Sequence, residues 1–100
     1  MNDPFEALAH PLRRALLARL QREGELAAGE LAEGTDVSKP TLSHHLKVLT
    51  EAGLLDRERR GTSIYYRLNQ SLVEEVVHRV FDLFGVGQNK GPIGDLGEEP

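Results

Sequence analysis

Polar and basic side chains alternate with leucines at helical spacing between Ser38 and Leu49. Leu42, Leu46 and Leu49 recur at i, i+4 and i+7, which predicts a helix that buries these three leucines. The opposite side then carries lysines, hydroxyls and an imidazole, groups that can bond phosphates or base edges in the major groove of DNA. A solvated helix face would have the same composition, so this pattern alone leaves both interpretations open. The candidates, with Ser38 as the N-cap, are Ser38, Lys39, Pro40, Thr41, Ser43, His44 and Lys47.

A charged hairpin is predicted directly after this helix. Residues 54–60 and 63–68 alternate around Gly61-Thr62 and contain residues that favour strands. Arginines near the tip would suit a wing that lies along phosphates or enters the minor groove, which favours the DNA-binding interpretation of the helix. Arg57 and Arg67 could instead form surface ion pairs with neighbouring carboxylates. The candidates from the hairpin are Arg57, Arg59, Arg60, Thr62 and Arg67.

Charge is unevenly distributed along the chain, which has 100 residues and a formal net charge of -4. Residues 38–67 hold six basic and three acidic side chains, a net of +3, so the remainder carries -7. An acidic total does not suit a non-specific coat on nucleic acid, because affinity for phosphates needs a basic surface. The separation would instead turn one face of the protein toward DNA.

Composition excludes several classes of protein. The length suits a single domain. The chain has no cysteine, so it can form no disulfide, thiolate metal site or thiol redox switch. No apolar run approaches the roughly 20 residues that a membrane span needs, and the first residues lack the features of a signal peptide. We therefore expect a cytoplasmic protein.

Apolar spacing predicts the elements that position these groups. The fold class is mainly α with a small β-hairpin, a winged helix-turn-helix with five helices and a two-stranded wing. Residues 1–84 form the DNA-binding and dimerisation domain, and residues 85–100, with five glycines and two prolines, form a flexible tail. The helices are expected over residues 3–10, 11–23, 25–34, 39–52 and 70–84.

The last of these helices is strongly amphipathic. Its apolar stripe is too wide to leave in water, so we expect a partner to cover it. The residues of the stripe are Leu72, Val73, Val76, Val77, Val80, Phe81 and Phe84.

Several longer motifs are similar to those of a known family. They include Ala7-Leu-Ala-His-Pro-Leu-Arg-Arg-Ala-Leu-Leu, Ser38-Lys-Pro-Thr-Leu-Ser-His-His-Leu-Lys-Val-Leu and Gly61-Thr-Ser-Ile-Tyr-Tyr-Arg-Leu. With these motifs the chain resembles the ArsR/SmtB family of bacterial winged-helix repressors from Phe5 to about Phe84. Ala28-Gly-Glu-Leu-Ala and Ile64-Tyr-Tyr look most like its SdpR-type autorepressor branch.

The resemblance implies a homodimer held by the first and last helices, here through Phe5, Leu8 and the apolar stripe. It also implies that the major groove is read through positions that match Lys39, Pro40, Ser43 and His44. His45 ranks lower, because it could instead pack or fix the helix, and His10 is expected to be structural.

Many members of the family sense metals. The family motif Glu-Leu-Cys-x-Cys aligns with residues 25–29, where Ala27 and Gly29 replace the cysteines, so that thiolate site is absent. A second family site uses carboxylates and histidines of the last helix, where Glu74, His78 and Asp82 could bind Zn(II) or Ni(II). The favoured interpretation is a solvated face with Glu75 and Arg79 paired, and no cofactor is expected.

The leading hypothesis is a dimeric repressor that binds double-stranded DNA at an imperfect palindrome, with half-sites about one helical turn apart. Autoregulation, and release by an inducer or a protein partner, are expected by analogy. The alternatives are a Zn- or Ni-responsive metalloregulator and a winged helix that serves only protein interactions. An enzyme is not expected, because Ser43 and His44 are adjacent on a helix and point in different directions, and no acid is placed to orient the histidine.

Overall fold

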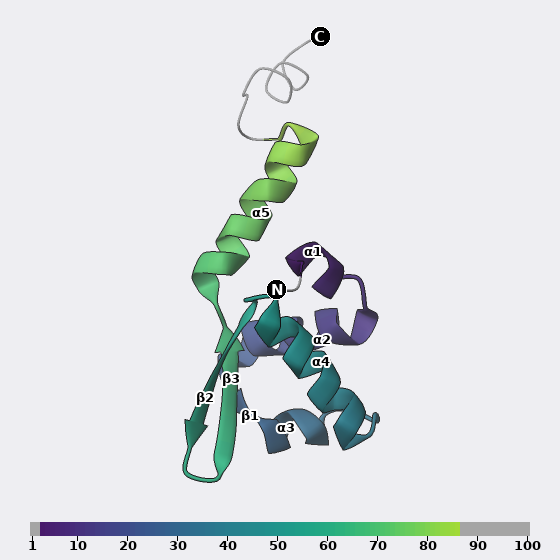
Figure 1. The fold of residues 1–100 in the computed structure, drawn as a ribbon, viewed down its shortest axis with the longest axis vertical. Coiled ribbons are helices and arrows are strands. Elements are labelled where there is room, and N and C mark those ends of the chain that lie inside the picture. Colours follow the sequence, from purple (N-terminus) through teal and green to yellow (C-terminus); the bar gives the residue numbers. More distant parts are fainter. Residues whose placement is uncertain (1–2, 87–100) are drawn as a thin grey trace.

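The structure is a computed structural model that describes residues 3–86 (Figure 1). The predicted bounds of the second and last helices are confirmed, and those of the helix over residues 39–52 and of the hairpin agree to within a residue. The first helix is shorter than the predicted residues 3–10 and ends at Ala7. The predicted tail over residues 85–100 lies, from residue 87 on, outside the described residues. The elements are α1 (Pro4–Ala7), α2 (Pro11–Glu23), β1 (Glu25–Ala27), α3 (Ala28–Glu33), α4 (Lys39–Glu51), β2 (Leu55–Arg60), β3 (Ser63–Leu68) and α5 (Gln70–Phe84).

Side-chain caps fix where the two helices around the wing begin. Ser38 Oγ accepts a hydrogen bond from the backbone N–H of Thr41 at 3.3 Å, as predicted for the N-cap of α4. Asn69 Oδ1 accepts from the N–H of Leu72 at 3.0 Å and begins α5 in the same way. After α4 the chain turns through Gly53 at a φ of 86°, a conformation that glycine reaches at least cost. These signals set the lengths of α4 and of the connection to the wing.

The core lies between α2, α3, α4 and one face of the sheet. Leu20, Leu31 and Leu49 are its largest fully buried side chains, one from each of the three helices. Leu42 and Leu46 are also buried, so the predicted inner stripe of α4 is confirmed. Burial of this stripe leaves the other side of α4 facing solvent.

The predicted helix over residues 25–34 is wrong in its first turn. Glu25–Ala27 form strand β1, which pairs antiparallel with β3 with Leu26 opposite Tyr66, and α3 begins only at Ala28. Helical spacing suggested a single helix, but the free edge of β3 satisfies the backbone of these residues and Leu26 is buried there. The sheet therefore has three strands in the order β1-β3-β2 rather than the two predicted.

Helix α5 rises away from the other helices (Figure 1). The first half of its apolar stripe packs on the same chain, since Val76 is buried and Leu72 and Val73 lie against the core. The second half is exposed, with Phe81 at 44% and Phe84 at 72% of full exposure. No helix in the described part of the chain is long and apolar enough to cross a membrane.

Candidate nucleic-acid interface

The candidates of α4 do not all face the same way: Ser43 and Lys47 line a groove beside the wing, whereas His44 lines a recess beside α1. All seven candidates on or before this helix are exposed. The hydroxyl of Ser38 donates a hydrogen bond to that of Thr41 at 3.0 Å, so both hydroxyls already take part in the cap at the start of α4. Within residues 3–86, the side chains of Lys39 and Ser43 have neither a hydrogen bond nor an ion pair. Lys39 and Ser43 can therefore bond an incoming ligand without breaking an internal contact.

The inner side of α4 is tied to α2 by a buried histidine. His45 is only 6% exposed, and its Nδ1 lies 3.0 Å from Nη1 of Arg13. Burial first, and then the nearby charges of His10, Arg13 and His44, lower the pKa of His45. His45 therefore packs and fixes the helix, as the lower ranking of this residue anticipated.

His10 has a structural position, as predicted. Its Nδ1 accepts a hydrogen bond from the N–H of Leu12 at 3.0 Å and caps α2. Its ring centroid lies 4.3 Å from that of His45. The turn before α2 is thus packed directly against α4.

The strand register divides the wing arginines between two faces of the sheet. Leu26, Tyr66 and Arg57 stand opposite one another, and because side chains alternate along strands, they share the face that covers the core. Arg59 is two residues from Arg57 and lies on this helix-facing side. Arg60 falls on the outer face.

Arg60 and Arg67 belong to an ion-pair cluster on that outer face. Nη2 of Arg60 lies 2.7 Å from Oε2 of Glu25 and 2.9 Å from Oε1 of Glu58, and its guanidinium lies over the ring of Tyr65. The hydrogen bond from Arg60 is the main reason that the pKa of Glu58 is lowered. Arg67 is also paired with Glu25 and Glu58, so the alternative of surface pairing holds for Arg67.

The pairing of Arg60 was missed in the sequence because Glu25 was placed in a helix. Pairing of strand β1 with β3 brings this carboxylate within reach of Arg60, 35 residues away along the chain. By contrast, Arg57 and Arg59 form no ion pair with any described residue.

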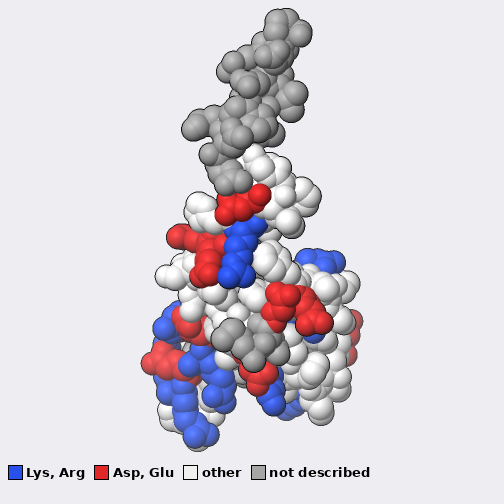
Figure 2. Space-filling model, turned by 45° about the horizontal axis from the view of Figure 1, so that its top comes forward, with Lys and Arg blue, Asp and Glu red and all other residues white. Residues whose placement is uncertain are grey.

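Figure 2 shows basic side chains running along the wing to its tip, with acidic ones among them. Thr62, the other hairpin candidate, is exposed in the turn at this tip.

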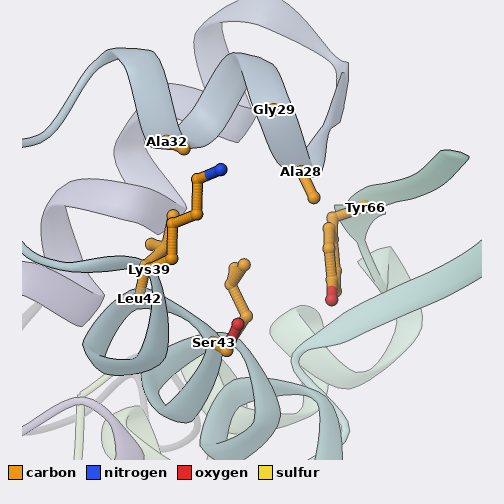
Figure 3. Close-up of a pocket in the computed structure, with 8 residues that line it drawn as sticks. Ala28, Gly29, Ala32, Lys39, Leu42, Ser43 and Tyr66 are labelled. Atoms are coloured by element: carbon orange, nitrogen blue, oxygen red, sulfur yellow. The ribbon is translucent and has the colours of Figure 1, made fainter.

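A groove of about 410 Å³ separates α4 from the wing. Ser43 and Tyr66 also line a second recess, of about 220 Å³, between α3 and α4. Figure 3 shows Lys39 extending over this recess from α4, with the ring of Tyr66 on the opposite side of the recess. The groove is lined by Ser43, Lys47, Thr50, Glu51, Arg57 and Tyr66.

Comparison with known proteins identifies this arrangement. A family model described as a helix-turn-helix domain matches residues 8–58. The transcriptional repressor SdpR of Bacillus subtilis (strain 168) is 36% identical over 89 residues, which cover 89% of this chain and 98% of that protein. A biofilm growth-associated repressor of Agrobacterium fabrum is 38% identical over 80 residues, covering 80% of this chain and 68% of that protein. This chain belongs to the ArsR/SmtB family of winged-helix transcriptional repressors.

Solved structures of the ArsR family agree with this fold. The crystal structure of a possible transcriptional regulator for arsenical resistance has a TM-score of 0.72 and 35% identity, and the match covers 95% of this chain and 97% of that one. The repressor BigR from Xylella fastidiosa has a TM-score of 0.62 and 35% identity, with 80% and 81% covered. Membership of the family confirms the prediction of a DNA-binding transcriptional regulator rather than an enzyme.

The metal candidates of this ArsR/SmtB member do not form a site within one chain. Within residues 3–86, no three His, Asp or Glu side chains come together as metal ligands. Glu74, His78 and Asp82 follow one another along an exposed side of α5. Glu75 and Arg79 pair at 3.5 Å on the same helix, as predicted. Nothing in the geometry of the single chain therefore favours metal sensing by α5.

Proposed function

We propose that this regulator is a homodimeric repressor that binds an imperfect palindrome in bacterial promoter DNA. The observation that carries the proposal is the shared orientation of two cationic surfaces. Ser43 and Lys47 of α4 border the same groove as Arg57 of the wing, and Arg59 lies two residues further along the same side of the strand, so helix and wing can contact one duplex together. Side chains of α4 would read base edges in the major groove, and the wing would bind phosphates.

Exposed apolar surface supports a dimer. Phe81 and Phe84 of α5 are exposed, as is Phe5 of α1 at 37%. Leu8, Val73 and Val77 line an apolar recess of about 230 Å³ at the base of α5. Exposed apolar patches of this kind mark interaction surfaces, and two-fold pairing through them would present two α4 helices to half-sites about one helical turn apart.

Repression would follow from covering promoter DNA. The similarity to the transcriptional repressor SdpR supports repression. Autoregulation in the cytoplasm, with release by a small molecule or protein that favours a dimer unable to bind, completes the proposal. Release by Zn(II) or Ni(II) through Glu74, His78 and Asp82 of two chains is the second candidate, and it has only the order of these residues along α5 in its favour.

The test is a titration of the purified protein against the DNA upstream of its own gene and against a scrambled duplex. It is made at physiological salt, with and without Zn(II) or Ni(II). The proposal requires tight binding to the upstream DNA and weak binding to the scrambled duplex. Release by metal alone would shift the assignment to a metalloregulator, and equally weak binding to both duplexes would contradict autoregulation.

A further inference from the structure

We propose that Tyr66 contacts DNA, with its hydroxyl donating a hydrogen bond to a phosphate in the groove between α4 and the wing. Tyr66 was not among the sequence candidates, because a tyrosine inside a predicted strand suggests packing. The inference rests on the proposed function, since it needs DNA to lie along α4.

The side chain of Tyr66 has a buried ring and an available hydroxyl. Tyr66 lies on β3, the central strand between β1 and β2. The residue is 9% exposed, and its ring belongs to the hydrophobic core. No described residue forms a hydrogen bond with its hydroxyl. In the described part of the chain, every buried side-chain polar atom has a hydrogen-bond partner. Because the Tyr66 hydroxyl has no such partner, it is not buried and must reach the surface. Such a hydroxyl can donate to a ligand without giving up an internal bond.

The position of this hydroxyl suits a phosphate. Tyr66 lines both the groove and the recess, and in Figure 3 its hydroxyl oxygen points toward α4. Arg57 stands opposite Tyr66 in the neighbouring strand, while Ser43 and Lys47 come from the facing helix. An anion in this groove would meet the cations of Arg57 and Lys47 and the hydroxyl of Tyr66, the chemistry that holds a DNA phosphate.

One acidic side chain also borders the groove. Glu51 lies at the end of α4, with an Oε2 atom 3.9 Å from Nζ of Lys47. It would repel a phosphate at that end, so the favourable position is the part of the groove between Arg57 and Tyr66.

The experiment compares Tyr66→Phe with Tyr65→Phe. Tyr66→Phe removes only the hydroxyl and keeps the packed ring, whereas Tyr65 lies on the outer face against Arg60. Tyr66→Phe should weaken binding to the operator and to a scrambled duplex alike by about tenfold, because a phosphate contact carries no sequence information. Tyr65→Phe should bind within about twofold of the wild type, and thermal unfolding should be unchanged for both.

A methylphosphonate scan of the operator then locates the contact. Replacing one phosphate at a time with its neutral analogue should reveal one position in each half-site where the replacement weakens binding by the wild type. At that position the replacement should hardly weaken binding by Tyr66→Phe, because the variant has already lost the contact. Unchanged binding by Tyr66→Phe, or equal losses for both proteins at every position, would overturn the inference. If Lys39→Ala and Lys47→Ala also bind normally, the whole proposed DNA surface is wrong, whereas losses in those two variants alone would refute only the role of Tyr66.

Discussion

Arg13 and His45 form a hydrogen bond of 3.0 Å between Nη1 and Nδ1 that joins α2 to the buried side of α4. An arginine can only donate, so Nδ1 of His45 must accept and the imidazole must be neutral. Nε of Arg13 also donates to the carbonyl of Ala7 at 2.7 Å. One guanidinium therefore holds the end of α1 and α4 together, and it orients the face of α4 that we assign to DNA.

Stability should fall in acid because His45 is buried as a neutral imidazole beside the charges of His10 and Arg13. The pKa of His45 is lowered on folding, so the unfolded chain binds the proton more readily, and the stabilisation is present above the ordinary value of 6.5 and lost as pH falls through the folded value. The loss should not exceed about 1.4 kcal/mol per pH unit for one proton. Chemical denaturation between pH 7.5 and roughly 5 checks this slope. His45→Gln should flatten it, whereas His78→Gln, on the exposed side of α5, should not.

A side chain at Gly53 should lower the free energy of unfolding. Its φ is 86°, and a Cβ atom there would lie 2.8 Å from Cδ2 of Leu72 in α5. Gly53→Ala should cost about 1–2 kcal/mol of unfolding free energy from the left-handed backbone alone. Gly29→Ala is the matched control, because a Cβ at Gly29 meets nothing within 4 Å and alanine favours a helix. Equal denaturation midpoints for the two variants would contradict this account of the turn.

The two faces of the wing should differ in their effect on DNA binding. Arg59→Ala removes a cation without an ion pair among the described residues, so affinity should fall about fivefold and the salt dependence should become shallower by about one counterion. Arg60→Ala should change affinity less, because this guanidinium is already paired with Glu25 and Glu58. Titrations over a range of salt concentrations measure both slopes. A larger loss for Arg60→Ala would mean that DNA displaces the carboxylates.

Lys47 and Ser43 should have different roles on α4. Lys47→Ala should weaken binding to specific and scrambled duplexes alike, since a lysine that holds phosphate reads no sequence. Ser43→Ala should mainly relax the preference for the operator. Competition titrations with both duplexes separate the effects, and equal losses for the two variants on every duplex would refute this division.

The exposed half of α5 should hold the dimer together. Phe81→Glu places a carboxylate on the exposed apolar surface, so it should convert the dimer to a monomer that remains folded. His78→Glu adds the same group on the polar side of the helix and should leave the dimer intact. Sedimentation velocity distinguishes the two states. A wild type that is monomeric at every concentration, or a Phe81→Glu variant that stays dimeric, would contradict this assignment.

Local signals were sufficient to predict most of the helices. The leucine spacing of α4, the cap at Ser38 and the stripe of α5 are all encoded within a few residues, so their bounds could be read from the sequence. Strand β1 could not, because Glu25–Ala27 form a strand only through pairing with β3 about 40 residues later. The same limit hid the pairing of Arg60 with Glu25 and the position of Tyr66 in the groove, since both depend on the register of the sheet.

Selection of bound duplexes from a random-sequence library, with the full-length protein, tests the central claim most directly. The account predicts enrichment of an imperfect inverted repeat whose half-sites lie about one helical turn apart. Recovery of a single half-site would contradict the proposed dimer on DNA. No enrichment of any sequence would contradict sequence-specific recognition by α4.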